Sequence, residues 1–255
     1  MSDRISVVIP TYNEANNLSK LVAALLALPL NLDVLVVDDD SPDGTGRIAN
    51  HLAAAHPGRV DVLHRKGKLG LRSAYLQGFE KVLAGGASAI VQMDGDFSHD
   101  PRELTVLVKA LKSADVVFGS RYCAGGSVDK RWPTWRKALS AFGNLYVRAI
   151  LGVKVRDATT GFRVWRRDTL LQMPLDRIQA NGYVFLVEMA YLAGCLEFRI
   201  AESPIHFADR RWGTSKMSLA IQCEAAARVW QVWWDYRDVR RMGRSARLRA
   251  VFLAQ

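Results

Sequence analysis

Apolar runs of strand length alternate with polar turns and helical patterns through the first half of this chain. The runs are Ile5–Ile9, Leu32–Val37, Val60–Leu63, Ala89–Met93 and Asp115–Phe118. A polar turn follows each run, and helical patterns follow the first three turns up to about residues 28, 55 and 84. Strands that alternate with helices form a mostly parallel twisted sheet flanked by helices, with right-handed crossovers. The pattern predicts one large α/β domain.

The turns after these strands carry the polar residues that indicate a ligand site. Parallel strands present their carboxyl ends at one edge of the sheet, where open α/β sheets bind ligands. Polar turns follow strands in any α/β protein, so one turn is weak evidence and several converging turns are stronger evidence. The side chains expected to share this crevice are Tyr12, Glu14, Asp38, Asp39, Asp94, Asp96 and Arg121.

Two carboxylates, Asp94 and Asp96, stand one residue apart directly after the fourth strand. The glycine between them lets the chain bend so that both can face one ligand. A hard divalent cation such as Mg²⁺ or Mn²⁺ takes oxygen ligands and is held by one or two carboxylates together with substrate phosphates. The Ser98 hydroxyl follows within reach. The alternative interpretation is that Asp96 or Asp100 only caps the helix that begins near Pro101.

The chain contains neither the GxGxxG turn of dinucleotide-binding folds nor the GxxxxGK[ST] loop of P-loop proteins. Phosphate charge would therefore be met by a metal ion and by Lys or Arg side chains. The Asp39 carboxylate could accept hydrogen bonds from a ribose or a base. These features indicate a nucleotide-binding domain without a glycine cradle.

Composition and charge argue against several classes of protein. The chain has 255 residues, 49% of them apolar, which is enough for one sizeable core. Its longest apolar run, residues 21–30, is too short to cross a bilayer and contains Pro29. Three cysteines without CxxC spacing, and no signal-peptide pattern, predict a cytoplasmic protein without disulfides or zinc. The net charge of +10 indicates an anionic partner, which is nucleic acid, anionic lipid or a phosphorylated substrate.

Short motifs extend beyond the carboxylate pair. They are PTYNE (10–14), DDDSPDGT (38–45), KLGL (68–71), MDGDFSH (93–99), GSRY (119–122), RKALS (136–140), DATTGFR (157–163), NGYVFLVEM (181–189) and DRRWGTSK (209–216). Many sugar transferases share the first motif, but the combination is specific. Over residues 5–216 the chain resembles family 2 glycosyltransferases of the GT-A fold, and more narrowly dolichyl- or polyprenyl-phosphate mannose synthases.

The resemblance implies that mannose is transferred, with inversion, from GDP-mannose to the phosphate of a polyprenyl (dolichyl-type) lipid. It implies Mg²⁺ or Mn²⁺ as cofactor, held by Asp94, Asp96 and Ser98. It also implies catalytic roles for Asp96, Arg121 and Arg210. Relatives that use other sugars often carry transmembrane helices after the catalytic domain, and this chain has no such segment.

The resemblance further implies that Arg121, Arg136 and Ser140 meet the acceptor phosphate. A phosphate monoester is already an anion at neutral pH, so we assign no general base. One departure from the family pattern is Gly95, where many relatives carry alanine. The residues implied in binding the nucleotide sugar are Pro10, Tyr12, Glu14, Val37, Asp39, Asp94, Gly95, Asp96, Arg121, Arg210 and Lys216.

Two titratable residues remain open to interpretation. Glu188 lies in an otherwise apolar helical pattern and is either an ion-pair partner of the arginines or a structural charge. We interpret His99 as a turn or supporting residue and not as a metal ligand.

Residues 217–255 form a predicted helical tail after a catalytic domain of residues 1–216. The apolar stripe of its helix, residues 218–242, consists of Ala226, Val229, Trp230, Trp233 and Tyr236. Arginines at 237, 240, 241, 244, 247 and 249 follow. Aromatic residues beside an arginine cluster suit an interfacial helix, which predicts peripheral binding to the inner face of a membrane. The alternative is a helix packed on the catalytic domain with a solvated basic end.

Other functions remain open at this stage. A related enzyme could use UDP-glucose or another nucleotide sugar, because mannose is implied by the resemblance alone. A nucleotidyltransferase would also use paired carboxylates and a metal, but it would carry a Gly- and Lys-rich loop where this chain has PTYNE. A nucleic-acid-binding module would spread basic and aromatic residues across the domain, whereas the basic residues here concentrate in the tail. We therefore expect no nucleic-acid partner.

Overall fold

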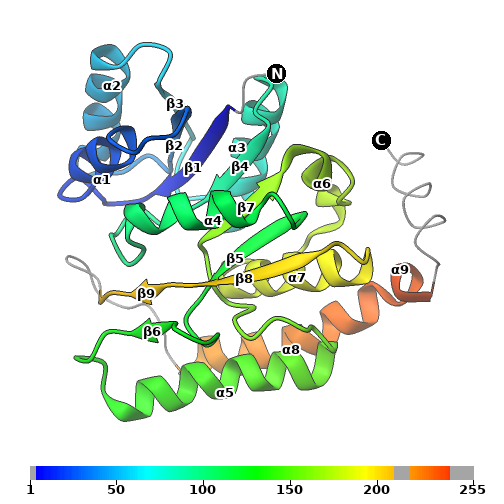
Figure 1. The fold of residues 1–255 in the computed structure, drawn as a ribbon. Helices are drawn as coiled ribbons and strands as arrows, with labels where there is room; N and C mark the ends of the chain where they lie inside the picture. Colours follow the sequence, from blue (N-terminus) through cyan, green and yellow to red (C-terminus); the bar gives the residue numbers. More distant parts are fainter. Residues whose placement is uncertain (1–3, 210–218, 242–255) are drawn as a thin grey trace.

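The computed structural model describes residues 4–209 and 219–241. Its centre is a seven-stranded sheet in the order β3-β2-β1-β4-β7-β5-β8 (Figure 1). The five predicted strands are present as β1 (Ile5–Thr11), β2 (Leu32–Asp38), β3 (Val60–His64), β4 (Ala89–Gln92) and β5 (Val116–Ser120). Strands β1 to β4 pair in parallel, which confirms the predicted α/β class.

Two strands of this seven-stranded sheet lie outside the predicted set. Strand β7 (Arg163–Arg166) inserts antiparallel between β4 and β5, and β8 (Ile200–Pro204) pairs in parallel with β5. Arg163 is fully buried, and its guanidinium donates to the carbonyl oxygens of Ala158 at 2.8 Å and Thr160 at 3.0 Å. Burial lowers the pKa of Arg163 to about 9. The insertion moves the end of β5, and with it Arg121, one strand away from the end of β4.

Helices cover both faces of the sheet, and the alternation of side chains along the strands explains why. In β1, Val7 and Ile9 pack toward α1, α2 and α4, whereas Val8 packs toward α3, α5, α7 and α8. Figure 1 shows α4 in front of the sheet and α3 behind it. The longer helices are α1 (Leu18–Leu26), α2 (Thr45–Ala55), α3 (Leu71–Ala84), α4 (Leu104–Ala110), α5 (Thr134–Leu151), α7 (Gly182–Cys195) and α8 (Leu219–Asp235).

A short 3₁₀ turn follows the carboxylate pair, and the structure shows which residue caps it. A 3₁₀ turn, Pro101–Glu103, precedes α4, and Asp100 accepts a hydrogen bond from the Arg102 backbone N–H at 2.9 Å. Asp100 is therefore the cap, and Asp96 is not used for that purpose. The remaining short elements are α6 (Arg167–Leu171), α9 (Arg237–Arg241), the 3₁₀ turn Leu175–Arg177 and the pair β6 (Ser127–Val128) and β9 (His206–Phe207).

The predicted C-terminal helix corresponds to α8 and α9, and its described residues pack on the catalytic domain. Val229 and Tyr236 are buried, and the Tyr236 hydroxyl donates to Glu188 of α7 at 2.9 Å. Glu188 also accepts from the backbone N–H groups of Gln179 and Ala180, so its role is structural, and burial raises its pKa. The predicted stripe is thus an internal contact, although Trp230 remains 53% exposed. No helix in the described ranges is long and apolar enough to span a membrane.

Candidate active site

The loops after β1 and β4 meet at the carboxyl edge of the sheet, as predicted. A methyl group on Gly95 would lie 3.4 Å from Glu14 Cγ and 3.6 Å from the carbonyl oxygen of Pro10. The predicted residues of the first and fourth strand ends are therefore neighbours. The same distances are ordinary van der Waals contacts, so an alanine would also fit at position 95.

Backbone strain concentrates at this edge. Among the described non-glycine residues, Asn13 (φ 64°), Asp40 (φ 54°), Phe97 (φ 60°) and Glu197 (φ 59°) have positive φ. The first three lie in the loops after β1, β2 and β4. Left-handed conformations are costly for residues with a Cβ and cluster at ligand sites, where the surrounding structure enforces them. The strain thus falls on the same turns that carry the predicted ligands.

The carboxylate pair has the composition of a site for a hard cation. Asp96 is 6% exposed, and one of its carboxylate oxygens accepts from the Ser98 backbone N–H at 3.0 Å. The Asp94 carboxylate lies against Gly161, where an added Cβ would come within 3.0 Å of its oxygen. The Ser98 hydroxyl is buried and has no hydrogen-bond partner among the described residues. No group of three or more His, Cys, Asp or Glu residues in the described ranges forms a metal site by itself.

These observations fit a metal that the protein holds only in part. A cation of the Mg²⁺ type is commonly bound by one or two carboxylates and completed by waters and substrate phosphates. Two carboxylates match that donor set, together with the Ser98 hydroxyl, which is buried and has no hydrogen-bond partner among the described residues. Such a cation does not need all of its ligands to come from the protein.

His99 lies beneath this loop and supports it. Its ring is fully buried between Phe162, with ring centroids 5.1 Å apart, and Phe207, at 5.4 Å. Burial lowers the pKa of His99 to about 4, so the ring is neutral at physiological pH. The structure places His99 in a packing position, in agreement with its interpretation as a supporting residue.

Asp38, the last residue of β2, and Asp39, the residue after it, have different surroundings. Asp38 accepts hydrogen bonds from the hydroxyls of Thr11 at 3.0 Å and Ser41 at 2.6 Å, which fixes the turn after β2. Asp39 instead forms an ion pair with Arg65 at 2.7 Å. Its second oxygen accepts from the backbone N–H groups of residues 69 and 70. Burial raises the pKa of Asp39, and the Arg65 charge opposes this shift.

Asp39 therefore holds the loop 65–70 against the sheet edge. Lys68 of this loop lies over the Tyr12 ring, with Nζ 4.1 Å from the ring centroid. Val37 is fully buried in the core, and its carbonyl oxygen accepts a hydrogen bond from the Thr11 hydroxyl at 3.5 Å. Arg65 was not among the predicted site residues, because a basic residue in a Gly- and Lys-rich turn carries no sequence signal for a buried partner.

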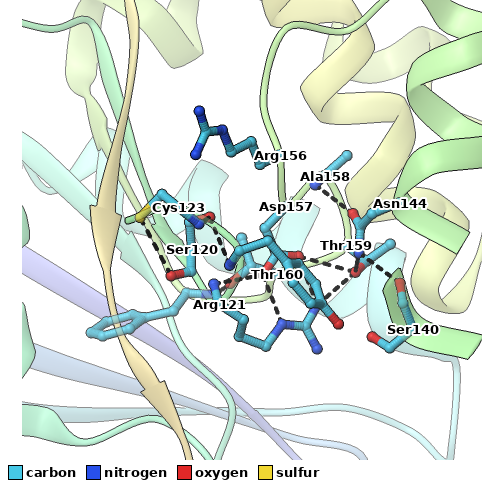
Figure 2. Close-up of polar contacts among 12 residues, drawn as sticks. Ser120, Arg121, Cys123, Ser140, Asn144, Arg156, Asp157, Ala158, Thr159 and Thr160 are labelled. Carbon is cyan, nitrogen blue, oxygen red and sulfur yellow. Dashed lines mark hydrogen bonds and ion pairs between the residues drawn. The ribbon is translucent and has the colours of Figure 1, made fainter. Parts of the chain in front are cut away.

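Arg121 is locked by a second buried aspartate, Asp157 (Figure 2). Its Nε and Nη2 atoms donate to the two carboxylate oxygens of Asp157 at 2.7 and 2.6 Å, and Nη2 also donates to the Thr159 hydroxyl at 2.7 Å. Burial in itself lowers the pKa of Arg121, but the Asp157 carboxylate more than offsets this effect and raises it. The guanidinium carbon lies 5.1 Å from the Phe207 ring centroid. Arg121 is thus a fixed cation at the carboxyl end of β5.

Of the remaining predicted site residues, the structure describes Arg136 and Ser140. Arg136 on α5 lies over the Trp132 ring at 3.8 Å and pairs with Asp209 at 3.2 Å. Ser140 lies one turn further along α5. Arg210 and Lys216 lie outside the described residues, as does the predicted domain boundary at residue 216.

A family model and curated relatives match this chain. Residues 6–172 match the model of Glycosyl transferase family 2. A polyprenol monophosphomannose synthase from Mycolicibacterium smegmatis is 43% identical over 251 residues, covering 98% of this chain and 92% of the relative. An undecaprenyl-phosphate mannosyltransferase from Micrococcus luteus is 46% identical over 226 residues, covering 89% of this chain and 92% of the relative.

Solved structures share the fold at low sequence identity. Glucosyl-3-phosphoglycerate synthase from Mycobacterium tuberculosis, solved with Mn²⁺ and UDP, has a TM-score of 0.62 at 19% identity, covering 90% of this chain and 78% of the other. A mannosyltransferase from Pyrobaculum calidifontis, solved with GDP-mannose and Mn²⁺, has a TM-score of 0.58 at 17% identity, covering 100% of this chain and 74% of the other. These likenesses confirm the predicted GT-A fold. The chain belongs to glycosyl transferase family 2 and is a glycosyltransferase.

Proposed function

We propose that this enzyme transfers mannose from GDP-mannose to the phosphate of a polyprenyl lipid, with inversion at the sugar. The observation that carries the proposal is the 43% identity to a polyprenol monophosphomannose synthase across 98% of this chain. The geometry supports it, because a carboxylate pair and a fixed arginine lie at the carboxyl edge of one sheet. A nucleotide sugar and an anionic acceptor need these two kinds of group.

The donor diphosphate would be held with Mg²⁺ or Mn²⁺ by Asp94 and Asp96, with the Ser98 hydroxyl nearby. The mannosyltransferase from Pyrobaculum calidifontis was solved with GDP-mannose and Mn²⁺, which supports this assignment. The metal would neutralise charge on the GDP leaving group. Arg210 and Lys216 would add positive charge to the same diphosphate.

The acceptor would be bound by Arg121, Arg136 and Ser140. An oxygen of the acceptor phosphate attacks the anomeric carbon of mannose while the bond from that carbon to the GDP oxygen breaks. The attacking oxygen is already anionic, so no protein group has to remove a proton. The role of the arginines is to hold two anions close together and to orient the attacking oxygen.

The nucleotide would be bound beside the loop 65–70 that Asp39 holds. We expect Asp39→Asn to raise the Kd for GDP roughly ten- to hundredfold, because hydrogen bonds to a charged group contribute about 1.5–3 kcal/mol. Titration calorimetry with GDP and Mn²⁺ measures this effect. Asp33→Asn is the matched control, since Asp33 pairs with Arg4 at the opposite end of the same strand. An equal change in both variants would contradict a specific role for Asp39.

A membrane surface is the expected location of the acceptor, and α5 offers a face suited to it. Trp135, Phe142 and Leu145 are 66, 62 and 60% exposed. Their spacing places them on one side of the helix. Helix α5 contains basic residues and no acidic residue. An exposed apolar stripe beside basic side chains suits the surface of an anionic bilayer.

The arginine-rich tail remains a proposed second contact. Arg237 to Arg241 form α9, and the later arginines lie outside the described residues. Deleting residues 242–255 is expected to weaken binding to anionic vesicles and to leave GDP binding intact. Cosedimentation of both forms with phosphatidylglycerol vesicles checks this, and equal sedimentation would contradict it.

Replacing Trp135, Phe142 and Leu145 together by serine is expected to lower vesicle affinity by at least about tenfold. Burying one such side chain contributes about 1.5–3 kcal/mol, and 1.4 kcal/mol is tenfold. Cosedimentation with phosphatidylglycerol vesicles measures the change. Val106→Ser on α4 and Leu171→Ser on α6 remove exposed apolar side chains elsewhere and serve as controls. An equal loss of vesicle affinity in the control variants would show that α5 is not the face that contacts the membrane.

A further inference from the structure

Asn144 joins the helix that carries Ser140 to the loop that fixes Arg121 (Figure 2). It is 3% exposed, and every polar atom of its amide has a partner. The amide nitrogen donates to the Ser140 carbonyl oxygen at 3.1 Å and to the Thr159 hydroxyl at 3.2 Å. The amide oxygen accepts from the Ala158 backbone N–H at 2.9 Å. The side chain thus connects α5 to residues 158 and 159.

The Thr159 hydroxyl is the next link toward Arg121. It accepts from Arg121 Nη2 at 2.7 Å and from Asn144, and it donates to Asp157 Oδ1 at 3.2 Å. A hydroxyl has one proton and two lone pairs, so these three contacts satisfy it in one orientation. Arg121, Thr159, Asn144 and Ser140 therefore form one chain with a defined donor and acceptor at each step.

The loop 156–160 is held independently on its other side. Glu202 of β8 accepts from the backbone N–H groups of residues 156 and 157 at 2.9 and 3.1 Å. Arg163 of β7 donates to the carbonyl oxygens of residues 158 and 160. Loss of Asn144 would therefore leave the loop in place and remove the side-chain hydrogen bonds that join it to α5.

The position of Asn144 in the sequence is consistent with a tertiary role. It lies in the interior of the 18-residue helix α5. Asparagine is a poorer helix former than alanine and competes for backbone hydrogen bonds. Its bonds to residues 158 and 159 offset this cost only in the folded protein.

We propose that Asn144 is a positioning residue that fixes the separation of Arg121 and Ser140 and so shapes the site for the acceptor phosphate. The inference rests on the proposed function of these two side chains. A phosphate monoester is a small anion, and its binding groups must be held within about 0.5 Å of the productive geometry. Asn144 touches neither substrate and acts through Thr159 and the turn of α5 at Ser140.

The test measures the KM for the acceptor, the KM for the donor and the Kd for GDP in variants of the full chain. Asn144→Ala and Thr159→Val are expected to raise the KM for a short polyprenyl phosphate about tenfold or more, with the KM for the donor and the Kd for GDP unchanged. Thr159→Ser keeps the hydroxyl and is expected to restore the wild-type KM. The double variant Asn144→Ala/Thr159→Val is expected to be no worse than the poorer single variant, because the two residues act in one chain. Asn50→Ala is the matched control, since Asn50 joins helix α2 to His64 of β3 through a single hydrogen bond.

Direct binding of farnesyl phosphate by calorimetry separates the possible failures. Wild-type binding with no change in Asn144→Ala would overturn the positioning role and leave the proposed function standing. No wild-type binding would overturn the acceptor assignment and the inference with it. A parallel loss of donor and acceptor affinity, with a lower Tm and no rescue by Thr159→Ser, would show that Asn144 is only structural.

Discussion

Asp96→Asn is expected to lower metal-dependent sugar transfer by about a thousandfold, or ~4 kcal/mol of transition-state stabilisation. Asp94→Asn should have a similar effect. Asparagine keeps the shape of each side chain and removes the negative charge that attracts a divalent cation. Initial rates over a Mn²⁺ titration measure the loss, and the electron paramagnetic resonance signal of bound Mn²⁺ in the presence of GDP reports binding separately.

Asp100→Asn is the matched control for the carboxylate pair. Asp100 lies in the same loop, but it caps the 3₁₀ turn and pairs with Arg102 at the surface. Asparagine caps a helix about as well as aspartate, so this variant should keep its activity and its metal dependence. Full turnover of Asp96→Asn, or an equal loss in Asp100→Asn, would show that the pair does not hold the metal.

Arg121→Ala is expected to reduce kcat/KM for the acceptor by about a hundred- to a thousandfold, the usual effect of removing one donor that stabilises charge in a transition state. It should also lower the free energy of unfolding by about 3–5 kcal/mol, because Asp157 would stay buried without its cation. Steady-state kinetics and urea unfolding measure the two effects. Arg121→Ala/Asp157→Ala should recover stability without recovering activity.

Arg199→Ala is the control for this prediction. Arg199 also makes a two-pronged ion pair, with Asp115, but its side chain is 63% exposed. Surface pairs of this kind contribute about 0–1 kcal/mol. A loss of activity in Arg199→Ala as large as that in Arg121→Ala would mean that lost stability, and not a role at the acceptor, explains the result.

The sequence pattern predicted the five strands β1 to β5 because each is an apolar run bounded by a polar turn. Strand β7 could not be found in this way. It begins with Arg163, whose burial depends on two carbonyl oxygens and on the Phe118 ring at 4.2 Å, and these partners come together only in the folded chain. The tail stripe was ambiguous for a related reason, because the same spacing of apolar residues suits a lipid surface and a protein surface.

Some residues of the candidate site could be predicted from the sequence, and others could not. Asp94 and Asp96 follow a strand, so their place at the carboxyl edge of the sheet could be derived from the parallel topology. Arg65, Asp157 and Asn144 could not, since each acts through a partner far away in sequence. The motif containing Asp157 contributed to the family resemblance, but its role as the partner of Arg121 required the structure.

The most direct test of the proposed function is transfer of radiolabel from GDP-mannose into organic-extractable lipid. The reaction contains a short polyprenyl phosphate and Mg²⁺ or Mn²⁺, and it runs beside UDP-glucose and an EDTA control. We predict lipid label from GDP-mannose alone, abolished by EDTA. Label from UDP-glucose alone, or no label from GDP-mannose while GDP binding is intact, would contradict the proposal.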